Sequence, residues 1–325
     1  MPTEKPIASL SLDLDNQWSY LKTHGDPGWE SFPSYLDVVV PRVLDILRAH
    51  QLTITVFVEG QDAALERNRG PLRAIADAGH EIGNHSFRHE PWLHRYDERQ
   101  IDGELSRAEE AIERATGQRP RGFRGPGFSV SRATLEALAR RGYRYDASIF
   151  PTFLGPLARA YYFRTARLSP EQRRQREALY GTLADGLRPL NPYCWDLGGT
   201  SLCEVPVTTL PGLRIPIHMS YLLYLAVFEA RLAMLYFRAA MRLCRATRTQ
   251  VSLLLHPLDF VGCDDTGSLS FFPAMNLVSA HKVRLVNEML QVLTSFFTVV
   301  TVNEHAERVS RIAPLPMVTP CFSRT

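Results

Sequence analysis

Short apolar runs alternate with longer segments of helical periodicity along most of the chain. Apolar or β-branched runs predict buried strands at 7–14, 52–59, 80–83, 122–124, 251–256 and 297–302. Apolar residues recur at helical spacing in the segments between them, at 35–50, 71–78, 98–116, 131–141 and 280–296. Such alternation indicates parallel β-α units, and 325 residues suit one α/β barrel domain.

The alternation breaks between residues 150 and 220. This stretch is rich in proline, glycine, arginine and aromatic residues, and it carries seven arginines against three acidic residues within 159–188. We therefore predict a single domain of residues 1–325 with an irregular insertion at about 150–220, placed on the rim of the barrel.

A long apolar and aromatic helix is predicted at 219–245. Arg231, Arg238, Arg242 and Arg245 are spaced seven, four and three residues apart, which places them on one helical stripe. Charges inside the run argue against a membrane-spanning segment. Two interpretations stay open: a barrel helix that packs a wide apolar face on the core, or a helix that lies at a membrane interface or binds a partner.

Composition narrows the function classes only slightly. The formal net charge of +3 gives no reason to expect nucleic acid as a partner. Five scattered cysteines without a CxxC pair fit reduced thiols better than a disulfide framework. The first fifteen residues show no charged head followed by an apolar core, so we expect no signal peptide and a cytoplasmic protein.

Residues able to do chemistry stand at the ends of predicted strands. Asp13 and Asp15 end the first strand, and His85 and His89 follow the third; further candidates end later strands, namely Arg124, Asp146 and His256. The carboxyl ends of barrel strands meet on one face, so these side chains are expected to meet in space. One carboxylate with two imidazoles leaves a metal position open for water, as in catalytic zinc sites.

Plainer interpretations exist for each candidate. The two aspartates could cap a strand end, although unpaired carboxylates on an apolar strand would be costly. Taken singly, His85 and His89 could be solvated loop residues. Arg124 could be a surface cation, and His256 could be a core histidine. The remaining histidines show no partner pattern and are interpreted as structural: His24, His50, His94, His218, His281 and His305. Three tryptophans could stack on a sugar ring or pack in the core: Trp18, Trp92 and Trp195.

Five ordered motifs give the chain a family resemblance. They are SLDLDN (11–16), HSFRH (85–89), RGPGFS (124–129), YDAS (145–148) and LLLHP (253–257). Over about residues 7–305 the chain resembles the polysaccharide deacetylase family, also described as the chitooligosaccharide deacetylase homology domain and carbohydrate esterase family 4. Its first motif has the Asp-x-Asp form seen in lipid-linked aminoarabinose deformylases. The resemblance implies a distorted (β/α)7-type barrel and a hydrolase of non-peptide carbon–nitrogen bonds.

The resemblance also implies a role for each motif residue. A divalent metal, zinc or alternatively cobalt or nickel, would be held by Asp15, His85 and His89. Asp13 would be the general base, kept ionised and aimed by Arg124.

On the same resemblance, His256 would protonate the leaving amine, and Asp146 would orient that histidine. The developing oxyanion would be met by the metal and by backbone N–H groups near Gly127 and Phe128.

These roles predict a metal-dependent enzyme that removes an N-acyl group, in the first instance acetyl, from an amino sugar. Without an export signal, the substrate would be a cytosolic or lipid-linked glycan precursor. The arginines at 159–188 and 231–245 favour a polyprenyl-phosphate carrier at a membrane surface, against the plainer interpretation of a solvated cationic face. Two alternatives stay open: a non-sugar amide, ureide or acylpolyamine hydrolase, and a catalytically inactive carbohydrate-binding homologue. An oligomer is compatible with the sequence.

Overall fold

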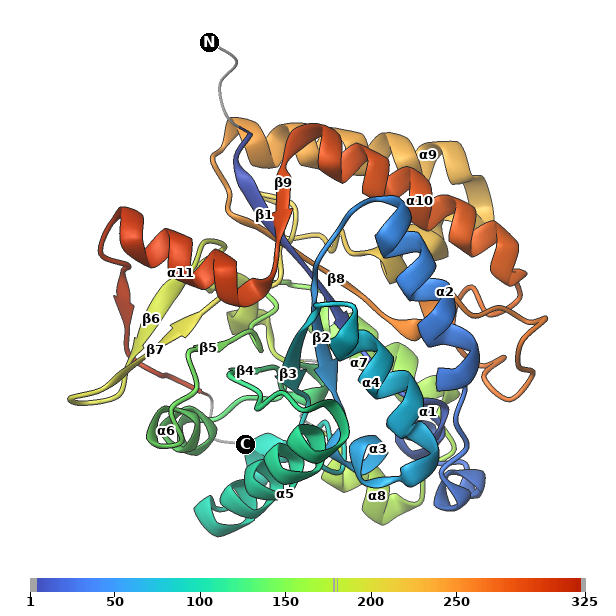
Figure 1. The fold of residues 1–325 in the computed structure, drawn as a ribbon, viewed down its shortest axis with the longest axis horizontal. Helices are drawn as coiled ribbons and strands as arrows, with labels where there is room; N and C mark the ends of the chain where they lie inside the picture. Colours follow the sequence, from blue (N-terminus) through green and yellow to red (C-terminus); the bar gives the residue numbers. More distant parts are fainter. Residues whose placement is uncertain (1–4, 178, 180, 323–325) are drawn as a thin grey trace.

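The computed structural model describes residues 5–177, 179 and 181–322, in which one sheet is surrounded by helices (Figure 1). The sheet runs in the order β10-β6-β7-β5-β4-β3-β2-β1-β8, and β9 pairs with the start of β1. The strands are β1 (Ile7–Asp13), β2 (Thr55–Val58), β3 (Glu81–Asn84), β4 (Gly122–Phe123), β5 (Tyr145–Asp146), β6 (Tyr193–Asp196), β7 (Ser201–Glu204), β8 (Val251–Leu255), β9 (Thr298–Val300) and β10 (Met317–Val318). All pairings are parallel except that of β6 with β7.

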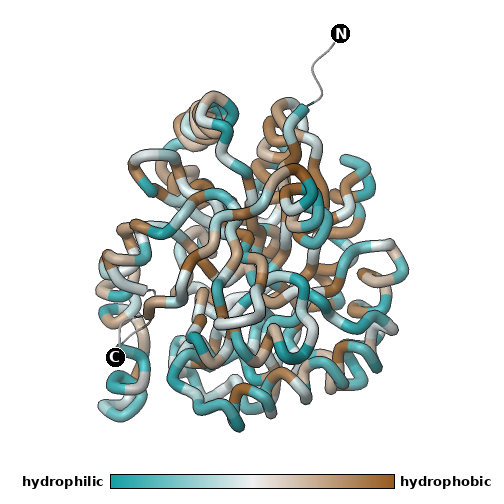
Figure 2. Tube along the Cα trace, turned by 90° about the vertical axis from the view of Figure 1, so that its left-hand side faces the viewer, coloured by the Kyte–Doolittle hydropathy of each residue, from teal (hydrophilic) through white to brown (hydrophobic). Residues whose placement is uncertain are grey.

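Helices follow the strands and pack outside the sheet. They are α1 (Gln17–His24), α2 (Leu36–Ala49), α3 (Gly60–Ala64), α4 (Arg69–Asp77), α5 (Glu98–Thr116), α6 (Arg132–Arg140), α7 (Gly155–Thr165), α8 (Pro170–Gln175), α9 (Met219–Ala246), α10 (Ser279–Phe296) and α11 (Val302–Ile312). The long α5 begins at a capping box of Asp97 and Gln100 and ends at Gly117, whose φ of 75° is a left-handed cap. Hydrophobic segments gather in the middle of the molecule (Figure 2).

Strand β1 has one apolar face and one polar face, and both are buried. Ala8, Leu10 and Leu12 belong to the main apolar cluster. The residues between them point to the other face, where Ser9 Oγ lies 2.9 Å from His305 Nδ1 and Ser11 Oγ accepts a hydrogen bond from Arg124. Because strand side chains alternate with period two, Asp13 continues this polar face.

The sheet is open, although the α/β architecture predicted from the sequence is confirmed. The strands at the two ends of the sheet are β10 and β8, and the chain that follows β7 reaches β8. The Val207 N–H donates to Ile149 O at 2.8 Å, and the Thr208 N–H donates to Ser252 O at 2.9 Å. Backbone hydrogen bonds thus hold the segment after β7 beside β8, as in a distorted barrel.

The predicted insertion divides into two parts. Helices α7 and α8 lie outside the sheet, whereas β6 and β7 are members of it. The hairpin turn between them contains Gly198 and Gly199, both with positive φ. The placement of the whole of 150–220 on the rim is therefore corrected: β7 lies within the sheet, paired with β5 on one side and with β6 on the other.

Helix α9 is long but not uniform. Its backbone leaves helical geometry at Glu229, where φ is −157° and ψ is 106°. The inner side chains include Leu222, Phe237 and Met241, which are buried against the core. The outer side of α9 is largely exposed. Packing against the barrel core therefore accounts for the apolar residues on only one face of this helix.

Candidate functional site

Strand β1 and the loop after β3 bring three metal-ligating side chains together. His85 Nε2 and His89 Nε2 each lie 3.2 Å from Asp15 Oδ1. The loop is shaped locally: Asn84 Oδ1 accepts the Ser86 N–H, and Ser86 Oγ accepts the His89 N–H. Ser86 and His89 have φ values of 62° and 49°, a left-handed geometry that turns both imidazoles toward the aspartate.

The donor set fits a divalent cation. One ligand atom from each of Asp15, His85 and His89 lies within 4.8 Å of the others, and all three residues are buried. Asp15 Oδ1 and His89 Nε2 have no hydrogen-bond partner within the described part of the chain, although buried polar atoms normally have one. His85 Nδ1 lies 2.7 Å from Arg124 O, a second contact that orients a ligating imidazole.

The electrostatics of the three side chains favour positive charge at this point. Burial alone raises the pKa of Asp15, but His89 and His85, each 3.2 Å from its Oδ1, outweigh it and lower the pKa well below 3.8. Burial lowers the pKa of His89, which keeps that imidazole neutral as a ligand must be. Burial also acts to lower the pKa of His85, but the Asp15 carboxylate 3.2 Å away raises it above 6.5 overall.

Asp13 and Arg124 form a buried ion pair next to these ligands. Arg124 Nη1 donates to Asp13 Oδ1 at 2.6 Å and to Ser11 Oγ at 2.8 Å, and its Nε donates to Ala147 O. Arg124 is fully buried and its guanidinium lies over the Phe57 ring at 4.4 Å. This side chain is therefore an internal counter-ion and not a surface cation.

His256 follows β8 directly beside the acid-bearing end of β1. Leu255 is in register with Leu12, so His256 and Asp13 are the next residues along neighbouring strands. His256 Nδ1 lies 3.0 Å from Ser220 Oγ, which in turn donates to Asp259 Oδ1 at 2.8 Å. This arrangement orients the imidazole through a serine from the first turn of α9.

Asp146 has other partners than those predicted. The sequence prediction paired it with His256, whereas Asp146 Oδ1 accepts a hydrogen bond of 2.6 Å from Ser148, whose Oγ accepts the Gly125 N–H at 2.8 Å. Asp146 is also in register with Glu204 on β7. The contacts of Asp146 support the turn after β4, and the hydroxyl that contacts His256 is that of Ser220.

The turn at 125–129 has the strained geometry expected for close approach to a substrate. Gly127 and Phe128 have φ values of 57° and 63°. A Cβ on Gly125 would lie 1.9 Å from Ser129 O, so only glycine fits there. The Phe128 N–H already donates to Gly125 O at 2.9 Å, and this corrects its assignment as an oxyanion donor. Gly127 is the exposed residue of the turn.

Sequence reasoning missed a second group of site residues. His218, interpreted as structural, lies with its ring 5.9 Å from that of His256, and burial together with the charges of His256 and Arg124 lowers its pKa well below 6.5. Glu59 is fully buried with Oε1 at 3.8 Å from His89 Nε2. The one sequence signal was a carboxylate that ends the apolar strand at 52–59; nothing comparable marked His218, Ser220 or Asp259.

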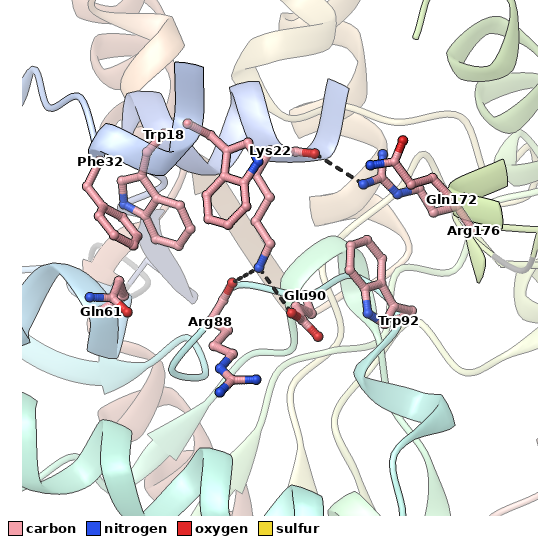
Figure 3. A pocket seen from close by; sticks show the side chains of 10 residues that line it. Trp18, Lys22, Phe32, Gln61, Arg88, Glu90, Trp92, Gln172 and Arg176 are labelled. Atoms are coloured by element: carbon pink, nitrogen blue, oxygen red, sulfur yellow. Dashed lines mark hydrogen bonds and ion pairs between the residues drawn. The ribbon is translucent and has the colours of Figure 1, made fainter. Parts of the chain in front are cut away.

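The three tryptophans separate into two environments. Trp18 and Trp92 line a cavity of about 400 Å³ next to the His89 loop (Figure 3). Trp195 is fully buried and its Nε1 donates to Glu204, so it is a core residue.

Comparison with known proteins agrees with this geometry. The polysaccharide deacetylase family model matches residues 26–145, a range that includes His85, His89 and Arg124. A peptidoglycan deacetylase of Helicobacter pylori is 31% identical over 165 residues, which are 49% of this chain and 53% of that protein. Over residues 26–145 the chain is therefore similar to the polysaccharide deacetylase family.

Other relatives agree on the family and differ in coverage. The peptidoglycan-N-acetylmuramic acid deacetylase PdaA of Bacillus subtilis is 34% identical over 111 residues, 34% of this chain and 41% of that protein. The chain thus spans about half or less of the length of these relatives. A solved structure assigned to the polysaccharide deacetylases, from Mycobacterium smegmatis, aligns over 99% of this chain and 97% of its own, with a TM-score of 0.60 and 21% identity. PuuE allantoinase aligns over 97% and 93%, with a TM-score of 0.61 and 17% identity. The last two likenesses concern the fold alone.

Proposed function

We propose that this protein is a metal-dependent amidohydrolase of the polysaccharide deacetylase family that removes an N-acetyl group from an amino sugar. The observation that carries the proposal is the convergence of Asp15, His85 and His89 beside the Arg124-held carboxylate of Asp13. A cation bound there would supply Lewis acidity, which polarises an amide carbonyl and makes water nucleophilic near neutral pH.

The chain's own residues account for the proton transfers. Asp13 would take a proton from the attacking water as the new C–O bond forms. His256, held by Ser220, would give a proton to the departing nitrogen as the C–N bond breaks. The balance is one water consumed, with acetate and a free amine as products. The exposed Gly127 stands where a backbone N–H can approach the developing oxyanion.

Metal content and product release test this proposal together. Elemental analysis of protein purified without chelators should give about one zinc, cobalt or nickel per chain in the wild type and none in Asp15→Ala/His85→Ala. The wild type should then release acetate from N-acetylated amino sugars. Absence of metal after reconstitution would move the protein to a binding-only role. Acetate or ammonia release from linear or cyclic amides, without release from sugars, would favour the non-sugar hydrolase.

The proposed substrate is a glycan precursor on a polyprenyl phosphate, handled by a cytoplasmic protein that binds the membrane peripherally. Among the described residues, 17 large apolar side chains are exposed, and 13 of them lie between Phe153 and Leu243. Phe228, Leu232 and Leu235 on α9 are 75%, 63% and 59% exposed. In the described chain, α9 is the one helix long and apolar enough to cross a bilayer, with 33% of its most apolar window buried. The exposed arginines toward its C-terminus suit lipid phosphates.

Vesicle binding tests the membrane part. We expect the wild type to bind vesicles containing anionic lipid at low salt, and Phe228→Ser/Leu232→Ser to bind at least about tenfold less. Val278→Ser/Ile312→Ser removes two exposed apolar side chains elsewhere and serves as the matched control. If the wild type stays unbound at low salt, the peripheral placement is wrong.

A further inference from the structure

The cavity lined by Trp18 and Trp92 adjoins the loop that carries His89. It is bounded by α1, by the 3-10 turn Pro27–Ser31, by the segment after β3 and by α8, and it encloses about 400 Å³ (Figure 3). Arg88 and Glu90, which flank His89 in the sequence, both line it. A ligand in this cavity would therefore lie one loop away from the metal-ligating side chains.

Aromatic faces form much of the wall. Trp18, Trp29, Phe32 and Trp92 line the cavity, and Phe32 packs edge-on against Trp18 and Trp29 with ring centroids 5.3 Å and 6.1 Å away. The Trp18 Nε1 donates to Asp62, which fixes that ring. Rigid aromatic surfaces of this kind suit the apolar face of a sugar ring.

The lysine in the cavity is already satisfied. Lys22 Nζ donates to Arg88 O at 2.8 Å and pairs with Glu90 Oε1 at 3.1 Å. Its ammonium also lies 5.4 Å from the Trp29 ring centroid. Lys22 therefore joins α1 to the His89 loop and contributes little uncompensated charge.

Arg176 is different, because its charge has only neutral partners among the described contacts. Its side chain is 3% exposed, with Nη1 donating to Thr23 O and the Tyr162 hydroxyl, and Nη2 donating to Lys22 O. Its guanidinium stacks over Trp92 at 4.9 Å, and its Nε has no hydrogen-bond partner within the described residues. A buried guanidinium without a carboxylate is costly unless an anion arrives.

We propose that this cavity binds a glycosyl phosphate, with the sugar ring against the tryptophans and the phosphate toward Arg176. The inference rests on the proposed function and names the part of the substrate that does not react. Phosphate matches a planar guanidinium well, whereas Arg88, which also lines the cavity, is already paired with Glu104 at 3.7 Å. The anionic group would then distinguish the substrate from neutral N-acetylated sugars.

Intrinsic fluorescence can report binding directly, because three of the four tryptophans line the cavity. Full-length protein is titrated with N-acetylglucosamine 1-phosphate, N-acetylglucosamine and inorganic phosphate. A nucleotide-linked N-acetylglucosamine and a short polyprenyl-phosphate sugar then separate the two sources of a glycosyl phosphate. We expect quenching by sugar phosphates at concentrations at least about tenfold below those needed for the neutral sugar or for phosphate alone.

Variants localise the effect. Arg176→Gln should weaken sugar phosphate binding at least about tenfold. Arg173→Gln removes the same charge three residues earlier, within α8 and outside the cavity lining, and should not weaken it. Because Arg176 is buried, Gln172→Ala at the cavity wall is a second probe, and thermal unfolding checks that each variant is folded. Equal weakening by Arg173→Gln, or unchanged binding in both folded cavity variants, overturns the proposal.

The outcome for the cavity is separable from that for the enzyme. Quenching without acetate release from any sugar would keep the cavity and reject the deacetylase. Acetate release that proceeds equally well from neutral sugars, with no quenching by sugar phosphates, would keep the deacetylase and reject the cavity.

Discussion

Two pairs of buried acids lie at the carboxyl ends of strands, and the protein neutralises them in opposite ways. On β1, Asp13 has a guanidinium at 2.6 Å and Asp15 has two imidazoles at 3.2 Å. On β5 and β7, Asp146 and Glu204 are in register with each other and have no cation among their described contacts. Burial raises the pKa of both, which favours a shared proton.

The two pairs of acids are suited to different roles, one to a reaction and the other to holding the fold together. A carboxylate that has counter-charges can accept a proton or a cation, whereas a pair that already shares a proton offers neither. Glu204 accepts N–H groups from Trp195 and Ile149, and Asp146 supports Gly125 through Ser148. The β1 pair is therefore equipped to react, and the β5–β7 pair to hold the barrel and its active-site turn.

The largest effect is expected from removing the counter-ion of Asp13. Arg124→Met should lower the free energy of unfolding by about 3–5 kcal/mol, because it leaves a buried carboxylate unpaired. Asp13→Asn/Arg124→Met should recover part of that stability while remaining inactive. Arg141→Met is the control: Arg141 also contacts two acids, but its side chain is 20% exposed, and about 1 kcal/mol or less is expected. Denaturant unfolding measures all three, and equal losses for Arg124→Met and Arg141→Met would contradict the comparison.

The link between the second acid pair and the active-site turn predicts the next effect. Ser148→Ala should cost about 1–3 kcal/mol, because the buried Gly125 N–H and the Asp146 carboxyl both lose their partner. Since the 125–128 turn then loosens, kcat should also fall. Ser295→Ala, at an exposed serine on α10, is the stability control. A stable variant with full activity would show that this link does not matter.

A positioning role for Ser220 predicts a smaller change, confined to turnover. Ser220→Ala should lower kcat about tenfold, about 1.4 kcal/mol on the barrier, with little change in KM. Ser220→Thr keeps the hydroxyl and should restore most of the rate. Rates on an N-acetylated sugar decide it, given the proposed function. A lower kcat together with a higher KM in both variants would point to a packing defect at the start of α9.

The residues predicted correctly from the sequence to converge are those whose partners are set by short motifs at strand ends. The HSFRH loop places two imidazoles by local geometry, and Asp13 ends the polar face of β1 with Asp15 two residues farther along the chain. Parallel topology then suffices to bring Asp15, His85 and His89 together. The positions of Arg124 and His256 follow for the same reason.

Long-range partners could not be predicted in this way. Glu204 meets Asp146 only because β7 inserts beside β5, and Ser220 reaches His256 only because α9 starts at the site. The double glycine between β6 and β7 was the available sign of a hairpin inside the supposed insertion. The hydrogen bond from the Phe128 N–H to Gly125 O depends on turn geometry that amino-acid composition does not encode.

The smallest effect, and the sharpest test of the shared proton, is expected from Asp146→Asn. An asparagine amide can donate to Glu204 as a protonated carboxyl would, so the unfolding free energy near pH 6 should change by no more than about 1 kcal/mol.

The pH dependence of the unfolding free energy should change more. Because the folded-state pKa of Glu204 is raised above its ordinary 4.5, the wild type loses this contribution to stability as pH rises through that raised pKa. Asp146→Asn should flatten this decline above pH 4.5 in urea unfolding, whereas Glu113→Gln, at an exposed position on α5, should leave it unchanged. A variant with the wild-type slope would mean that Asp146 and Glu204 are already both ionised, and the shared proton that distinguishes this pair from Asp13 and Asp15 would then be absent.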